Sequence, residues 1–168
     1  MPRLILARHA RAEMSQLGLD DHSRALTMEG RDAAARLAER LQTMGLRPDV
    51  ALVSSANRTV QTFKRMAAVW GKVPFHIEDD MYWSAGEQYL SVLARVGEAD
   101  TVLMVGHEPT TSHVAAWLSG EGSLEEALQR VAHGMPTAAA AVLELDIPWV
   151  EIGERSARLI DVVEGKPA

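Results

Sequence analysis

Cysteine is absent from the 168-residue sequence, which excludes disulfide bridges, thiolate metal ligands and a cysteine nucleophile. Long apolar runs are absent as well, since no segment approaches the roughly 20 residues that a membrane-spanning helix requires. The N-terminus has an early Arg3 and only a short apolar run, which does not fit a secretory signal peptide. We therefore expect a cytoplasmic protein that does not act at a membrane.

Basic residues are in the minority, with 17 Lys and Arg against 23 Asp and Glu and a net charge of -6. Proteins that bind nucleic acid generally need a broad basic surface, so this balance argues against a nucleic-acid partner. It leaves room for a local cationic pocket. The length predicts a single domain over residues 1–168, large enough to bury roughly two thirds of the surface of the unfolded chain.

The apolar run Leu4–Ala7 stops abruptly at Arg8 and His9. A continuous apolar run of this length is typical of a strand that is covered on both faces. In open α/β sheets ligands bind at the carboxyl ends of the strands, which is where Arg8 and His9 would lie. A guanidinium beside an imidazole predicts a site for an anion and a reacting group.

Residues 11–24 are polar and lack periodicity, which predicts a loop across the mouth of this site. A helix is expected to follow, with Thr27 as its N-cap and Gly45 as its stop. The face that this helix buries is predicted to comprise Ala34, Leu37, Leu41 and Met44.

A second apolar run, Val50–Val53, leads through Ser54–Ser55 into a predicted helix over residues 57–70. Arg58 then lies in the first turn, beside the positive end of the helix dipole, where anions are favoured and arginine is not. A bound anion would remove this conflict. The buried face of the helix is predicted to comprise Val60, Phe63 and Ala67.

Two capping boxes predict helix starts in the second half, Ser84–Glu87 and Ser123–Glu126, the latter for a short helix through Val131. The inner face of the helix after the first box is predicted to comprise Leu90, Leu93 and Val96. Further strands are expected, the last two of them antiparallel at the edge, over Pro74–Ile77, Ala138–Leu145, Trp149–Ile152 and Leu159–Val163.

Thr101–Val105 is a further apolar run, and it is followed by Gly106, His107, Glu108 and Pro109. Pro109 is expected to be the first residue of a helix. That helix is predicted to bury Val114, Trp117 and Leu118.

Strands that alternate with helices imply right-handed crossovers and a mostly parallel central sheet with helices on both faces, a three-layer α/β/α sandwich. The carboxyl ends of parallel strands lie at one edge. Arg8, His9, Arg58 and His107 are therefore expected to meet in one crevice.

Two arginines and two histidines without metal-ligand spacing suit a phosphoryl group, because a guanidinium can bind phosphate oxygens through two parallel hydrogen bonds. Phosphoryl transfer needs positioning, charge stabilisation and an in-line nucleophile, and a neutral imidazole can be that nucleophile. His9 fits this role. His107 would donate to an equatorial oxygen as charge shifts in the transition state.

Five motifs in this order resemble the histidine phosphatase (phosphoglycerate mutase-like) superfamily, and within it the SixA-type phosphohistidine phosphatases. The motifs are Arg8–Ala10, Asp21–Gly30, Ser54–Thr62, Val105–Pro109 and Pro136–Ala138. The resemblance implies a phosphoglycerate mutase-like fold and a phosphatase without cofactor or metal. It also implies a phosphohistidine intermediate on His9, with Arg8, Arg58 and His107 as the phosphate pocket.

The sequence departs from the family pattern in two places. Ala10 stands where the commonest triplet of the superfamily ends in glycine, which is tolerable if φ is negative there. Larger members also carry a carboxylate that protonates an alkoxide leaving group, and its equivalent is unknown here. The candidates are Glu13, Glu108 and Asp80. Lack of a strong acid would suit a phosphoramidate substrate.

Two functions are consistent with these residues. The first is a phosphatase that acts on phosphohistidine in a protein, or on a small phosphorylated molecule, and releases inorganic phosphate. The second is a catalytically weak module that binds phosphoproteins with the same pocket. The intact set of His9, Arg8, Arg58 and His107 favours the enzyme.

Overall fold

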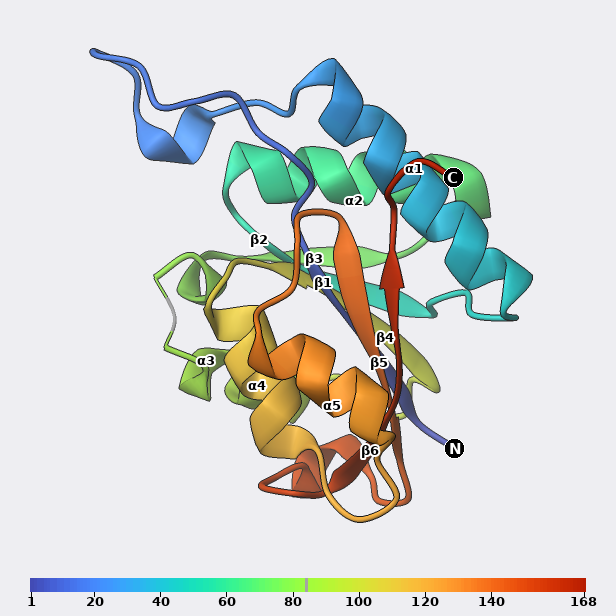
Figure 1. Ribbon diagram of the computed structural model, residues 1–168. Coiled ribbons are helices and arrows are strands. Elements are labelled where there is room, and N and C mark those ends of the chain that lie inside the picture. The colour runs from blue at the N-terminus through green and yellow to red at the C-terminus, as the bar shows by residue number, and fades with distance from the viewer. Residues whose placement is uncertain (84) are drawn as a thin grey trace.

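A six-stranded sheet forms the centre of the protein in the computed structural model, which describes residues 1–83 and 85–168 (Figure 1). The strands are β1 (Arg3–Arg8), β2 (Val50–Ser54), β3 (Phe75–Glu78), β4 (Thr101–Gly106), β5 (Ala139–Leu145) and β6 (Ala157–Glu164). Their order across the sheet is β3-β2-β4-β1-β5-β6. The first four strands are parallel, and β5 pairs antiparallel with both β1 and β6. The predicted mostly parallel sheet is thus confirmed.

Helices cover both faces of this sheet, as Figure 1 shows. One face carries α1 (Met28–Thr43) and α2 (Asn57–Trp70). The other face carries α3 (Glu87–Leu93), α4 (Thr110–Leu118) and α5 (Glu125–Ala132). Short 3-10 turns occur at η1 (Asp21–Ser23), η2 (Asp79–Met81) and η3 (Trp149–Glu151). None of the described helices is long and apolar enough to cross a membrane.

Alternate side chains of β1 enter two separate cores. Leu4 and Leu6 pack in the core beneath α3, α4 and α5, whereas Ile5 and Ala7 pack in the core beneath α1 and α2. All four are fully buried, as expected of a strand with both faces covered. The carboxyl end of β1 is therefore held from both sides.

The predicted ends of α1 are confirmed. The Oγ1 of Thr27 accepts a hydrogen bond from the backbone N–H of Gly30 at 2.9 Å, and Gly45 has a φ of +78° just after the helix. The prediction that Met44 is buried is wrong, since its side chain is 42% exposed. Met44 is the C-cap, where the helical periodicity no longer applies.

In α2 the predicted bounds are confirmed, and Phe63 is buried. Val60 and Ala67 are only partly buried against the same core. In α4 the predicted burial of Val114 and Leu118 is confirmed.

Trp117 was expected to be buried with that face of α4, but it is 42% exposed. The buried positions of the helix repeat at Thr111, Val114, Ala115 and Leu118, and Trp117 lies off this stripe. Pro109 is the N-cap, so α4 begins one residue later than predicted.

The predicted start of α3 is wrong, since the helix begins at Glu87 with Gly86 as its N-cap. The predicted cap, Ser84, lies outside the described residues. The helix ends at Leu93, so Val96 lies beyond it. The buried side chains of α3 are Tyr89, Val92 and Leu93, with Leu90 partly buried.

The second predicted capping box is also wrong. The N-cap of α5 is Leu124, and no side chain caps this helix. The hydroxyl of Ser123 donates instead to the carbonyl of Gly120 at 2.8 Å and accepts from the N–H of Leu159 at 3.0 Å. The Ser123 hydroxyl is therefore engaged by β6 and does not cap α5.

The predicted edge strand over Trp149–Ile152 is a 3-10 turn. Trp149 is 2% exposed, and its Nε1 donates to the carbonyl of Ala99 at 2.7 Å. Trp149 therefore holds this turn against the loop that carries Ala99, and the segment does not form an edge strand. The strand predicted at Leu159–Val163 is confirmed within β6.

Candidate active site

Three strand ends bring the predicted residues to one edge of the sheet. His9 follows β1, and its N–H donates to the carbonyl of Gly106, the last residue of β4, at 3.0 Å. The ring centroids of His9 and His107 are 5.5 Å apart. Arg58, in the first turn of α2, is close enough to lower the pKa of both imidazoles. The expected meeting of these residues is thus observed.

The tautomer of His9 follows from its hydrogen bond. The Nδ1 lies 2.7 Å from the carbonyl oxygen of Ala10, which can only accept, so Nδ1 carries the proton in the neutral ring. This leaves the lone pair on Nε2. Burial is the main reason that the pKa of His9 falls to about 4, and the charges of Arg58 and Arg8 contribute, although the hydrogen bond to Ala10 opposes them. At neutral pH His9 is therefore an uncharged base with a free Nε2.

Ala10 takes the place of the family glycine without backbone strain. It is not among the residues with positive φ, so the condition set by the sequence is met. Its N–H donates to the Oγ1 of Thr62 at 2.9 Å, and its side chain is fully buried. This contact fixes the turn after His9 against α2.

His107 is held by its backbone and by one ring nitrogen. Its N–H donates to the hydroxyl of Tyr89 at 3.0 Å, and its Nε2 lies 2.7 Å from the Oγ of Ser54. The preceding Gly106 leaves room for Tyr89, because a Cβ there would lie 2.0 Å from that hydroxyl. Burial is the main reason that the pKa of His107 falls to about 3, and the charge of Arg58 contributes. The ring is therefore neutral at neutral pH unless an anion binds beside it.

Arg58 is buried, and Asp21 in η1 holds it. The guanidinium donates to the carbonyl of Asp21 at 3.0 Å and to its carboxylate at 3.2 Å. The same carboxylate accepts from the hydroxyl of Tyr82 at 2.5 Å and from Arg24 at 3.0 Å. The Tyr82 hydrogen bond is the main reason that the pKa of Asp21 falls to about 2, with the charges of Arg58 and Arg24 contributing. Asp21 is thus a fixed counter-ion of Arg58.

Asp21 and Tyr82 received no role from the sequence. Asp21 belongs to one of the five motifs, but its contact with Arg58 depends on how η1 folds back over α2. Tyr82 comes from the segment after η2, and no local pattern links it to the site.

Unpartnered donors mark the pocket. Four buried side-chain nitrogen atoms of the described chain have no hydrogen-bond partner, namely Arg8 Nε, Arg58 Nε, His107 Nδ1 and Trp70 Nε1. Three of these belong to the predicted site. The two arginine atoms are N–H donors, and His107 Nδ1 is a donor in the tautomer whose Nε2 accepts from Ser54. An unpaired buried N–H costs on the order of 1–3 kcal/mol, so these donors fit a ligand with several acceptor oxygens. Phosphate and its analogues are such ligands.

The three acid candidates form no hydrogen bond with His9, His107, Arg8 or Arg58 among the described residues. Glu108 caps the first turn of α4, since it accepts from the N–H of Ser112 at 2.9 Å and from its hydroxyl at 2.6 Å, and also from the hydroxyl of Thr111. Glu13 and Asp80 are exposed, and among the described residues no hydrogen bond or ion pair joins either carboxylate to the site. Within residues 1–83 and 85–168, no group of three His, Cys, Asp or Glu side chains could hold a metal ion.

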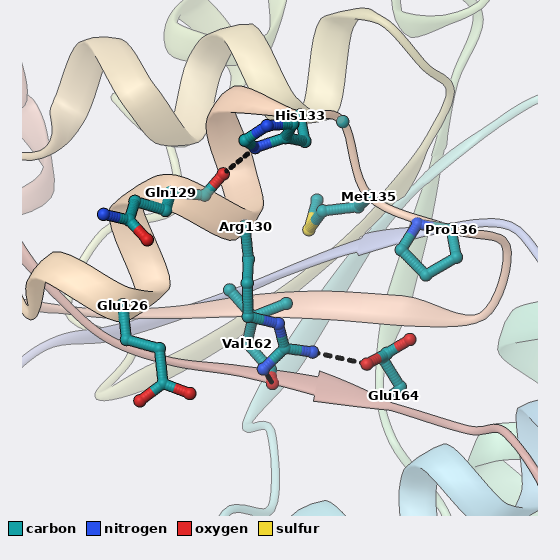
Figure 2. Close-up of a pocket in the computed structure, with 9 residues that line it drawn as sticks. Glu126, Gln129, Arg130, His133, Met135, Pro136, Val162 and Glu164 are labelled. Atoms are coloured by element: carbon teal, nitrogen blue, oxygen red, sulfur yellow. Dashed lines mark hydrogen bonds and ion pairs between the residues drawn. The ribbon is translucent and has the colours of Figure 1, made fainter.

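A hollow of about 390 Å³ between α5 and β6 is lined in part by Met135, whose carbonyl accepts from Arg8 at 3.0 Å (Figure 2). Its arginine is paired with the carboxylate of Glu164. Arg130 donates to the carbonyl of Val162 and to the carboxylate of Glu164, both at 2.6 Å. His133 is hydrogen-bonded through Nδ1 to a carbonyl of its own helix. We call this the α5–β6 hollow.

Comparison with known proteins gives one consistent result. The profile of the histidine phosphatase superfamily (branch 1) matches residues 4–135. A solved structure from Nakamurella multipartitia, assigned as the phosphohistidine phosphatase SixA, is 28% identical with a TM-score of 0.84 and covers 96% of this chain and 94% of that chain. The structure with the same assignment from Agrobacterium tumefaciens is 32% identical with a TM-score of 0.80, covering 96% and 97%. An uncharacterized Mycobacterium tuberculosis protein, Rv1276c, is 30% identical over 155 residues, which are 91% of this chain and 96% of that protein.

Proposed function

Because the chain belongs to the histidine phosphatase superfamily, we propose that it hydrolyses phosphohistidine in a protein, or a small phosphorylated molecule, through a covalent intermediate on His9. Family membership and the SixA-type relatives support phosphatase activity in general. One observation carries the finer proposal. His9 is neutral with a free Nε2 and lies beside the unpartnered N–H groups of Arg8, Arg58 and His107.

In the first step, phosphoryl oxygens accept hydrogen bonds from Arg8, Arg58 and His107. The Nε2 lone pair of His9 attacks phosphorus in line, so that a P–N bond forms while the bond to the leaving group breaks. The leaving group departs with that electron pair and takes a proton from water. The negative charge of the phosphoryl group raises the pKa of His107, which favours its protonated, donating form.

In the second step, water attacks the phosphorus of the phosphohistidine. The P–N bond breaks, its electron pair returns to Nε2, and inorganic phosphate leaves with the oxygen and one proton of the water. The other proton of the water goes to the solvent, which replaces the proton that the leaving group took in the first step. The N–H at Nδ1 remains on the carbonyl of Ala10 throughout, which keeps the ring in one orientation. His9 is thus regenerated as the neutral base.

The choice of phosphohistidine as substrate follows from the leaving group. Imidazole is easily protonated near neutral pH, whereas an alkoxide needs a proton in the transition state. Glu108 is engaged by α4, and Glu13 and Asp80 are solvent-exposed. A substrate that leaves without help from an acid therefore suits these residues best.

The rival proposal is a phosphoprotein-binding module that uses the same pocket without turnover, and the engagement of Glu108 supports it. One assay separates the two. The protein is incubated with p-nitrophenyl phosphate and with a phosphohistidine protein, and phosphate release is followed. The phosphatase releases phosphate from both substrates, whereas the binding module retains the phosphoprotein and releases none.

A further inference from the structure

A hollow of about 440 Å³ opens beside two neighbours of Arg58, Asp21 and Tyr82. It is lined by Asp20, Asp21, His22, Ser55, Asp79, Tyr82 and Trp83. Two of these residues also belong to the phosphate pocket. Asp21 binds Arg58, and the Tyr82 ring lies 5.7 Å from the ring of His107 and 5.9 Å from the guanidinium carbon of Arg58. A group in this hollow therefore belongs to the molecule whose phosphate Arg58 binds.

The charge of this hollow is negative and uncompensated. Asp21 is neutralised by Arg58 and Arg24. Asp20 and Asp79 are exposed, and neither forms an ion pair with a residue that the structure describes. Among the described residues, the carboxylate of Asp20 accepts one hydrogen bond, from the backbone N–H of His22. A second anionic group would be repelled here, and a cation would be attracted.

Aromatic rings supply the remaining walls. Tyr82 contacts Trp83 edge-on at 4.5 Å and His22 at 4.8 Å between ring centroids. Trp83 is 85% exposed, so a face of its indole is free for contact. Cations bind over indole and phenol faces, and an adjacent carboxylate adds to this attraction. Carboxylates beside aromatic faces are the surroundings that a guanidinium or ammonium group prefers.

The preceding segment favours a polypeptide as the source of that cation. Leu17 and Leu19, next to Asp20 in the chain, are 106% and 58% exposed. A small molecule in the hollow would leave both uncovered, whereas a chain that crosses the site can pack on them. Residues of an extended chain rise about 3.3 Å each, so a side chain one or two positions from the phosphorylated residue spans the distance from Arg58 to the hollow.

We propose that this hollow binds a lysine or arginine side chain that lies within two residues of the phosphorylated residue of a polypeptide substrate. The inference rests on the proposed phosphatase function and names its substrate class more narrowly. It predicts a preference for a basic neighbour that the phosphate pocket alone would not produce.

The test uses peptides that each contain one phosphohistidine. One has glutamine at the four nearest positions, and the others have lysine at one of these positions. For at least one lysine peptide, kcat/KM is expected to exceed that of the glutamine peptide roughly three- to tenfold. Asp79→Asn and Trp83→Ala should abolish this ratio and leave hydrolysis of the glutamine peptide and of p-nitrophenyl phosphate unchanged.

Asp100→Asn is the matched control, because Asp100 is exposed just before the amino end of β4, at the opposite end of the sheet. It should preserve the ratio. Equal rates for all peptides with the unmodified protein, or equal losses in Asp79→Asn and Asp100→Asn, would overturn the inference. Failure to hydrolyse p-nitrophenyl phosphate and every peptide would overturn the proposed function instead. The hollow is then tested by calorimetry, where tighter binding of a lysine peptide supports it and equal binding refutes it.

Discussion

The phosphate pocket and the α5–β6 hollow are joined through Met135, which lines the hollow and accepts a hydrogen bond from Arg8, and both regions contain arginine and histidine. In the α5–β6 hollow, Arg130 is paired with Glu164 and His133 with its own helix (Figure 2). In the phosphate pocket, Arg8, Arg58 and His107 each retain a buried nitrogen without a partner. Residue types that look alike in sequence are thus satisfied in one region and left ready for a ligand in the other.

The presence of an arginine does not by itself mark a binding site. What distinguishes the two regions is whether the donors of the arginine are already hydrogen-bonded to the protein. Arg130 joins α5 to β6, and both its Nη1 and its Nη2 donate to the protein. Arg58 is also paired, with Asp21, yet its Nε remains free and buried. A counter-ion that occupies only part of a guanidinium holds it in place and leaves donors for an incoming anion.

The largest expected effect is on kcat, which should fall when the histidine of the phosphate pocket is replaced but not when the histidine of the α5–β6 hollow is replaced. His9→Ala should lower kcat by at least about 10³-fold, because it removes the nucleophile. His133→Ala, in the α5–β6 hollow, should keep nearly full activity, because that ring is exposed and bonds only to its own helix. Steady-state hydrolysis of p-nitrophenyl phosphate measures both variants, with circular dichroism to confirm folding. A His9→Ala protein that keeps a tenth of the activity would show that another group attacks phosphorus.

The next effect concerns the leaving group. A placed acid typically contributes about 10²–10⁴-fold for poor leaving groups, and among the described residues the carboxylates of Glu13, Glu108 and Asp80 form no hydrogen bond with the phosphate pocket. We expect phosphohistidine and aryl phosphates to react much faster than alkyl or sugar phosphates, with kcat/KM falling steeply as the leaving-group pKa rises. A flat dependence, together with a large loss in Glu13→Gln or Asp80→Asn, would instead identify an acid and shift the substrate to small phosphomonoesters.

The affinity for an anion should distinguish two arginines of α2, Arg58 and Arg65. Arg58→Ala should weaken competitive inhibition by vanadate roughly thirtyfold, from the loss of about 2 kcal/mol in charge-assisted hydrogen bonds. Arg65→Ala should have little effect, because Arg65 is half-exposed on α2 and lies 3.7 Å from Asp32. Inhibition constants for the two variants and the wild type provide the measurement. Equal changes in both would mean that Arg58 does not face the anion.

The smallest effect is on stability. The pKa of His9 is lowered to about 4 and that of His107 to about 3, whereas both return to about 6.5 in the unfolded chain. Between these values the unfolded chain binds protons that the native protein does not, so the free energy of unfolding decreases as the pH falls below about 6.5. At pH 5 the loss is on the order of 1–2 kcal/mol for each histidine.

Urea unfolding between pH 7.5 and 5 measures this slope. The double variant His9→Gln/His107→Asn should show a flatter dependence than the wild type, and His133→Gln in the α5–β6 hollow should leave the slope unchanged. A double variant with the wild-type slope would mean that these two rings are not kept neutral by the fold.

The sequence allowed the strand ends and their residues to be predicted, because β1, β2 and β4 are short apolar runs closed by polar residues. The limits of α1 and α2 could be predicted from Thr27, from Gly45 and from the helical spacing of the apolar residues. Local pattern and tertiary structure agree in these elements.

What the sequence did not allow depends on contacts between distant segments. Ser123 looked like a helix cap, but its hydroxyl serves Leu159 of β6. Trp149 looked like part of an edge strand, but its ring is buried against the loop that carries Ala99. Asp21 acquires its role only when η1 meets Arg58 and Tyr82. Local patterns cannot reveal such competition for hydrogen bonds.

The proposed function depends on one step, in which the free Nε2 of neutral His9 attacks a phosphoryl group that Arg8, Arg58 and His107 bind. Rapid mixing with p-nitrophenyl phosphate, an alkaline quench that preserves phosphohistidine, and peptide mass spectrometry test it most directly. We expect an acid-labile phosphoryl group on His9 that forms within the first turnover, both in the wild type and in His133→Ala. Turnover without any phosphorylated protein, or a phosphoryl group on His107 instead of His9, would contradict it.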